Sequence, residues 1–169
     1  NGGMVAAAFE ALESGASGSL SSGLHHARHD RGTGFCTFNG LAIAARSALS
    51  AGARSVLILD LDAHCGGGTA SLIAGDDRVR QLDVATNGFD AYASTRQARL
   101  QLVTDAADYL PTIERELEVM LEDEPLTLAQ HCVLHLPPGA QHDQSIGQRE
   151  CLVQEAEGHV RHVVTAVSW

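Results

Sequence analysis

The sequence of 169 residues contains no lysine, and all 11 of its basic residues are arginine. With 21 acidic residues, the chain carries a formal net charge of −10. Because surfaces that bind nucleic acid are basic, we expect no direct contact with DNA or RNA. The acidity is compatible with a cationic substrate or partner, and it is equally common among soluble proteins.

Long apolar runs and paired cysteines are also missing. No stretch approaches the roughly 18 consecutive apolar residues that a transmembrane helix needs. The four cysteines are scattered, without the spacing of a disulfide framework or a cysteine zinc site. The segment Asn1-Gly2-Gly3 lacks the basic residues of a secretory signal. We therefore expect reduced thiols, a cytoplasmic location and no membrane partner, and we leave the oligomeric state open.

Apolar residues make up 44% of the chain, which is ordinary for a globular protein. Neither a repeat nor a domain boundary is evident, so residues 1–169 are interpreted as one domain. Strand and helix patterns alternate, which predicts an α/β fold with a mainly parallel sheet and helices on both faces. Helices are predicted over 4–12, 37–49, 70–74, 108–121 and 148–159, and strands over 56–59, 79–84, 99–103, 132–136 and 160–169. Residues 14–22 form a loop or a loop with one short strand, and Thr69 is the expected N-cap of the helix over 70–74.

The most informative stretch begins with the apolar run Val56–Leu59, typical of a strand buried on both faces. Polar residues then recur with period two, at Asp60, Asp62 and His64. If the extended geometry continues, the three side chains point to one side. Ligands of open α/β sheets bind at the carboxyl ends of strands, and carboxylates with imidazole suit a divalent metal such as zinc. The alternative is a turn or a solvated cap.

A second cluster lies upstream, in the glycine-punctuated polar segment Ser22–Cys36. It contains the adjacent histidines His25 and His26, which can bring two imidazoles to one reacting centre. One can act as a base toward a metal-bound water while the other stabilises charge. The alternative is an ordinary pair of surface histidines.

Together these motifs resemble those of the histone deacetylase family. Its tandem-histidine loop is similar to Ser22-Gly23-Leu24-His25-His26-Ala27, followed by Gly34-Phe35-Cys36-Thr37-Phe38-Asn39, and its metal strand is similar to Leu59-Asp60-Leu61-Asp62-Ala63-His64. Their order and separation also match, and the similarity extends from Gly2 to about Tyr92. The family includes bacterial acetylpolyamine and acetoin-utilisation relatives, so histones are not implied.

The resemblance implies an arginase/deacetylase-like fold and zinc-dependent hydrolysis of an acetylated amine, such as acetyl-lysine or acetylpolyamine. By the same resemblance, Asp62 and His64 are zinc ligands and His26 is the general base and acid. His25 is its electrostatic partner, with Asp60 as hydrogen-bond acceptor and as a contact of a possible K⁺ ion. These roles agree with metal-assisted amide hydrolysis, in which a histidine removes one proton and delivers another to the leaving amine. Two-manganese ureohydrolases share the sheet architecture, but they need more metal-binding aspartates than one Asp-x-Asp-x-His motif provides.

The same comparison assigns Gly34 and Phe35 to the acyl tunnel, and it also shows departures. The family's third zinc ligand is an aspartate after Gly-Ala, where this chain has Gln141, with Asp143 two residues on. Gly67 stands where the family usually has an acid or amide beside the second histidine. A glycine-rich segment with a transition-state tyrosine does not follow. We therefore expect an incomplete or decayed deacetylase domain of low or no activity, or alternatively a non-catalytic binding module with a decayed metal site.

Overall fold

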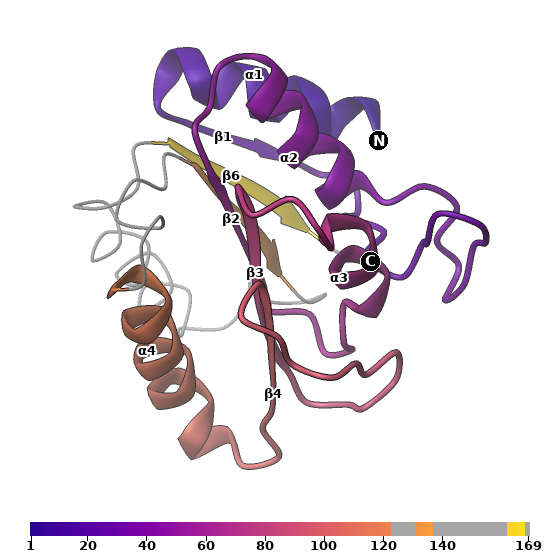
Figure 1. Cartoon of the computed structure of the whole chain (residues 1–169), viewed down its shortest axis with the longest axis vertical. Helices are drawn as coiled ribbons and strands as arrows, with labels where there is room; N and C mark the ends of the chain where they lie inside the picture. Colours follow the sequence, from indigo (N-terminus) through magenta and orange to yellow (C-terminus); the bar gives the residue numbers. More distant parts are fainter. Residues whose placement is uncertain (123–130, 137–161, 168–169) are drawn as a thin grey trace.

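The protein is described by a computed structural model in which residues 1–122, 131–136 and 162–167 are placed (Figure 1). One sheet of six strands has the order β1-β6-β5-β2-β3-β4. The strands are β1 (Ala16–Ser19), β2 (Val56–Asp60), β3 (Val79–Ala85), β4 (Ala98–Leu102), β5 (His131–Leu136) and β6 (His162–Val167). The helices are α1 (Gly2–Ser14), α2 (Gly40–Ser50), α3 (Gly67–Ile73) and α4 (Ala106–Glu122).

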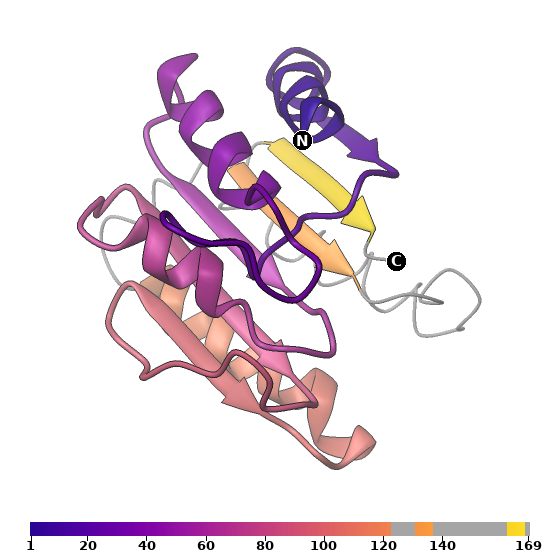
Figure 2. The same cartoon turned by 90° about the vertical axis from the view of Figure 1, so that its right-hand side faces the viewer.

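Every pair of neighbouring strands in the sheet is parallel, which confirms the predicted fold class. Strand β2 lies between β3 and β5, with Val56 beside Val79 and His131 at its amino end. The carboxyl ends of β2 and β3 therefore meet at the same edge of the sheet, where Asp60 lies beside Asp83 (Figure 2).

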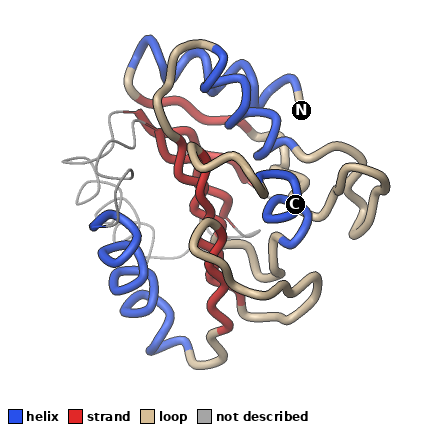
Figure 3. Tube along the Cα trace, in the orientation of Figure 1, coloured by secondary structure: helices blue, strands red, loops and turns tan. Residues whose placement is uncertain are grey.

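Helices cover both faces of the sheet, as Figures 1 and 3 show: α1, α2 and α3 lie on one face and α4 on the other. The residues of β2 divide between two hydrophobic clusters. Val56 and Ile58 pack with α1 and α2, whereas Leu57 and Leu59 pack with α4. All five residues of β2 are buried, which explains why Val56–Leu59 is continuously apolar rather than alternating, and the strand ends with the buried Asp60.

Most predicted elements are confirmed to within a few residues, including the short strand β1 in the segment 14–22. The N-cap predicted for α3 is wrong: α3 begins at Gly67 with Gly66 as its N-cap, so Thr69 does not cap it. Thr69 is fully buried within α3, where its backbone N–H donates to the carbonyl of His25 at 2.9 Å. The helix predicted over 148–159 lies outside the described residues, and the single-domain assignment stays a prediction. In the described part, no helix is both long and apolar enough to cross a membrane.

Helix α2 begins three residues later than predicted because Asn39 is its N-cap. The side-chain Oδ1 of Asn39 accepts a hydrogen bond from Ala42 N at 2.9 Å. Its Nδ2 donates to the carbonyls of His25 and Ala27, at 3.1 and 3.2 Å, and to Thr69 Oγ1 at 2.9 Å. One buried amide thus ties the histidine loop to the starts of α2 and α3.

We predict that Asn39→Ala lowers the free energy of unfolding by about 2–3 kcal/mol, since it removes a helix cap and leaves buried carbonyls without a donor. Urea denaturation of both proteins measures this change. Asn39→Asp is the matched variant, because it keeps the capping oxygen and loses only the donor. An Ala variant as stable as the wild type would show that Asn39 does not hold these segments together.

Candidate active site

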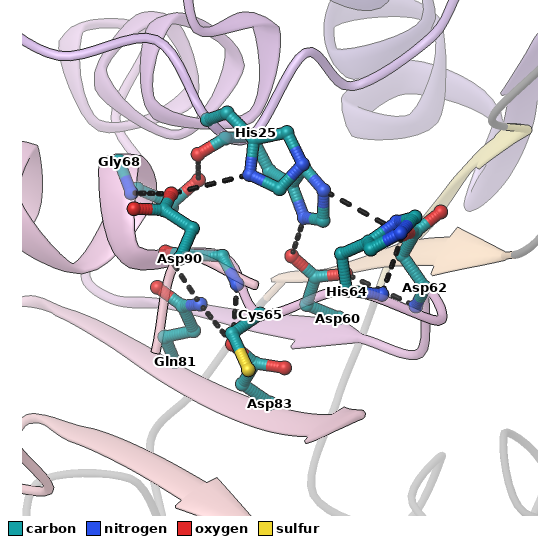
Figure 4. A network of polar contacts seen from close by, with 12 residues as sticks. His25, Asp60, Asp62, His64, Cys65, Gly68, Gln81, Asp83 and Asp90 are labelled. Carbon is teal, nitrogen blue, oxygen red and sulfur yellow. Dashed lines mark hydrogen bonds and ion pairs between the residues drawn. The ribbon is translucent and has the colours of Figure 1, made fainter. Parts of the chain in front are cut away.

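Three segments converge at the carboxyl edge of the sheet (Figure 4). They are the loop before α2, the end of β2 with the turn that follows, and the loop after β3. The two post-strand loops are joined by backbone hydrogen bonds, from Asn87 N to Ala63 O at 2.8 Å and from Cys65 N to Phe89 O at 3.0 Å. The polar side chains brought together are His25, His26, Asp60, Asp62, His64 and Asp90.

The Asp-x-Asp-x-His motif converges through turns rather than through a continued strand. Strand β2 ends at Asp60, whose Oδ1 accepts from Asp62 N at 3.2 Å. In the same way, Asp62 Oδ1 accepts from His64 N at 2.9 Å. These two local side-chain to backbone bonds bend the chain around the carboxylates. The prediction that the motif gathers on one side is confirmed, but the extended geometry assumed for it is wrong.

His25 lies among carboxylates. Its Nδ1 is 2.7 Å from Asp60 Oδ2 and its Nε2 is 3.6 Å from Asp62 Oδ1, and the histidine and both acids are almost fully buried. Burial alone lowers the pKa of His25, but the charges of Asp60, Asp62 and Asp83 outweigh it and raise the pKa to about 9. His25 is therefore an imidazolium at neutral pH.

His26 lies against His25, with the ring centroids 4.1 Å apart, yet its pKa moves in the opposite direction. Burial and the positive charge of His25 lower the pKa of His26, and the hydrogen bond to Asp90 opposes them only in part. The distance from His26 Nδ1 to Asp90 Oδ2 is 3.1 Å. Two adjacent histidines thus differ in charge at neutral pH, one a cation and the other a neutral base.

Asp90 and Phe89 were not among the predicted site residues. They follow β3 as Asp60 and Asp62 follow β2, so the rule that ligands bind at carboxyl ends of strands applies equally to both loops. The Phe89 ring lies edge-on to His26, with the centroids 4.9 Å apart. Gly67 has no side chain to place beside His26, and Asp90 supplies an acid there from another loop.

Asp62 and His64 form the candidate metal pair. Asp62 Oδ1 and His64 Nδ1 lie 3.3 Å apart, which is about the separation of two ligands on a tetrahedral zinc with bonds of about 2.0–2.1 Å. The His64 side chain is 46% exposed, whereas the Asp62 side chain is 5% exposed. Within residues 1–122, 131–136 and 162–167, no cluster of three or more ionisable side chains is arranged to hold a metal. The pair fits two positions of a zinc site, and the predicted third-ligand residues, Gln141 and Asp143, lie outside the described residues.

In the described part of the chain, three residues other than glycine have a positive φ, and all three lie around this site: Leu24 at 53°, Phe35 at 60° and Asp90 at 62°. Leu24 precedes the histidine pair, and Phe35 is fully exposed beside it. Such strain persists only where the surrounding structure holds it, and it gathers at functional sites.

Comparison with known proteins agrees with this site. The sequence pattern of the histone deacetylase domain matches residues 1–129. The chain belongs to the histone deacetylase family. The matched part includes every described site residue.

Among named members of the family, a probable deacetylase of Methanothermobacter thermautotrophicus is 44% identical over 85 residues, which are 49% of this chain and 26% of that protein. Histone deacetylase 2 of Arabidopsis thaliana is 33% identical over 125 residues, 70% of this chain and 32% of that protein. An acetoin utilization protein of Staphylococcus aureus is 39% identical over 69 residues, 41% of this chain and 18% of that protein. The chain therefore spans about a third or less of the curated relatives that it matches.

The histone deacetylase motif residue Gly34 lies directly on the ring of His26. Gly34 has φ +53°, and a Cβ added there would collide with the His26 ring and lie 2.9 Å from its Cγ. No larger residue fits at position 34 while His26 keeps its place. Glycine there fixes both the backbone turn and the position of the imidazole.

We predict that Gly34→Ala displaces the His26 ring and lowers the free energy of unfolding by more than the roughly 1 kcal/mol that the positive φ alone costs. Gly52→Ala is the matched control, because Gly52 has φ +106° and nothing within 4 Å of an added Cβ. Chemical denaturation gives the energies, and the His26 ring resonances give the displacement. Equal losses in both variants, with unchanged His26 resonances, would contradict the close contact.

Proposed function

We propose that the protein is a zinc-dependent deacetylase that hydrolyses an acetylated amine, such as acetyl-lysine or an acetylpolyamine. The observation that carries the proposal is the histidine pair: His25 lies 2.7 Å from Asp60, His26 lies 3.1 Å from Asp90, and the two rings are 4.1 Å apart beside the Asp62–His64 pair. These surroundings raise the pKa of His25 and lower that of His26. Amide hydrolysis needs both a base and a positive charge near the developing oxyanion. Family membership and relatives named as deacetylases support the same conclusion.

Zinc would be held by Asp62, His64 and a third ligand, which is Gln141 or Asp143. The bound ion would polarise the acetyl carbonyl and lower the pKa of a water molecule. The chain's own residues supply the remaining steps. His26 accepts the proton of the attacking water and later gives it to the leaving amine. His25, held by Asp60, contributes positive charge as negative charge develops on the carbonyl oxygen.

Two exposed aromatic side chains lie where we propose that the substrate enters the site. Phe35 is fully exposed and Phe89 is 48% exposed. The Phe89 ring lies edge-on to both His26 and His64, at 4.9 and 5.9 Å between centroids. We propose that Gly34, Phe35 and Phe89 line the path of an apolar chain that carries the acetyl group, as apolar pockets commonly do.

A monovalent cation beside Asp60 is a further part of the proposal. Asp83 lies next to Asp60, and both are fully buried. Among the described residues, Asp83 Oδ1 and the nearby Gln81 Oε1 lack hydrogen-bond partners. Burial and the charge of Asp60 raise the pKa of Asp83 well above its usual range. Carboxylate and amide oxygens are ligands that hard cations prefer. A K⁺ ion bound there would offset the repulsion between the carboxylates of Asp60 and Asp83. A cytoplasmic location, where K⁺ is plentiful, stays a prediction.

We predict that the purified protein binds zinc and hydrolyses an acetyl-lysine or acetylpolyamine reporter in a chelator-sensitive way, and that Asp62→Ala and His64→Ala lose both properties. Elemental analysis and amine release are the measurements. His29→Ala is the matched control, since His29 is an exposed histidine of the same loop as the catalytic pair. Equal zinc content in all four proteins would refute the metal assignment, and zinc binding without hydrolysis would favour the non-catalytic binding module.

The third ligand distinguishes a working site from a decayed one, because a catalytic zinc needs three protein ligands and an open position. If Gln141 takes the third place, we predict that Gln141→Asp tightens zinc binding about tenfold or more, since a carboxylate replaces a neutral amide. If Asp143 takes it, Asp143→Ala weakens binding and Gln141→Asp changes little. Competitive chelator titration separates the two cases. Unchanged affinity in both variants would show that this segment does not reach the metal.

A further inference from the structure

Both carboxylate oxygens of Asp90 make polar contacts with other segments of the chain. Its Oδ2 lies 3.1 Å from His26 Nδ1 and accepts from Gly68 N at 3.0 Å. Its Oδ1 accepts from Arg28 Nη2. Only 9% of the Asp90 side chain is exposed, and Figure 4 shows its carboxylate joined to Gly68 by a dashed line.

These contacts decide which nitrogen of His26 carries the proton. Arg28 and the Gly68 N–H both donate to Asp90, so both of its side-chain oxygens act as acceptors. His26 Nδ1 must then be the donor, which leaves the lone pair on Nε2. Asp90 therefore fixes both the tautomer and the orientation of the imidazole.

The space beside Gly67 shows why the acid comes from position 90. A Cβ added to Gly67 would collide with the backbone carbonyl of Asp90 and lie 2.9 Å from both Arg28 Nη2 and Asp90 Oδ1. Arg28 Nη1 also donates to the carbonyl of Gly67 at 3.0 Å. The ion pair of Asp90 and Arg28 thus fills the volume that a side chain at position 67 would need.

The backbone of the loop supports the same interpretation. Asp90 adopts φ +62°, a conformation that aspartate and asparagine tolerate better than most residues. The strain is held by the contacts of its side chain, so the loop is shaped to present this carboxylate. A residue that served only to close a turn would have no need of an arginine and a backbone amide as further partners.

We propose that Asp90 is the positioning residue of His26 and that Arg28 orients it, together replacing a side chain at position 67. The proposal rests on the proposed function, because it assigns His26 the role of base. The Asp90–Arg28–Gly67 arrangement is a coupled unit: the acid, the cation that orients it and the glycine that makes room for both.

The test follows the tautomer of His26 in the purified chain by ¹⁵N NMR of the imidazole at one fixed pH above neutrality. We expect the wild type to carry its proton on Nδ1, with slow exchange. Asp90→Ala should mix the two tautomers and speed the exchange. It should also lower kcat of the reporter reaction about a hundredfold with little change in KM, since general base catalysis contributes about 10²–10⁴-fold. Asp76→Asn is the matched control, because Asp76 pairs with Arg78 at 2.8 Å far from the histidines.

A second pair of variants guards against simple misfolding. Asparagine tolerates a positive φ as aspartate does, so Asp90→Asn leaves the backbone unchanged. If the amide oxygen of Asn accepts from His26, however, the amide nitrogen faces Arg28, and two donors then oppose each other. We expect this variant to lose the Nδ1 tautomer, and Arg28→Gln combined with Asp90→Asn to restore it, since a glutamine oxygen can accept from that amide. Recovery in the double variant would show that residue 28 orients residue 90.

The outcomes separate the two proposals. If Asp90→Ala leaves the tautomer, exchange and kcat of a folded protein unchanged, the positioning role is refuted while the proposed function stands. If the tautomer depends on Asp90 and no acetylated amine is hydrolysed by the wild type, the positioning role holds and the proposed function fails. If the double variant lacks the Nδ1 tautomer of His26, as Asp90→Asn alone is expected to, the orienting role assigned to Arg28 is refuted.

Discussion

The site depends on one buried carboxylate, that of Asp60 at the end of β2. A lone ionised carboxylate in a protein interior is strongly unfavourable, so Asp60 needs a partner in the folded chain. His25 meets this need at 2.7 Å, and the turn to Asp62 N uses the other oxygen. The charge that holds the histidine loop against the sheet is thus the same charge that keeps His25 protonated. Docking of the loop and the electrostatics of the site have one physical cause.

The difference between the two histidines follows from the charges around each ring. His25 lies near both Asp60 and Asp62, whose negative charges stabilise its protonated form. His26 has the carboxylate of Asp90 at 3.1 Å, which also pairs with Arg28. Desolvation and the neighbouring imidazolium then prevail and keep His26 neutral. Two adjacent and chemically identical side chains thus differ in charge because their surroundings differ.

Much of this arrangement could be predicted from the sequence, and the reasons are local. The apolar run before Asp60 and the helical spacing of α4 report burial directly, because the period of a pattern reflects the faces of an element. The boundaries of α2 and α3 were missed because Asn39 and Thr69 are used in tertiary contacts: Asn39 caps α2 and also bonds to Thr69, which lies buried inside α3. Asp90 was missed because its partner His26 is 64 residues away, and only the folded sheet brings them together.

The parallel arrangement of β2 and β3 explains why residues from two different loops can supply the acid beside His26. The loops after β2 and β3 leave the same edge of the sheet and are joined by backbone hydrogen bonds, so both reach the ring of His26. A carboxylate on either loop can meet Nδ1, provided that the other loop leaves room, and Gly67 leaves that room. A motif read position by position counts Gly67 as the loss of an acid beside the second histidine. In the structure Asp90 places a carboxylate 3.1 Å from that histidine, so this feature of the site has to be judged from the atoms around the ring rather than from one position of the motif.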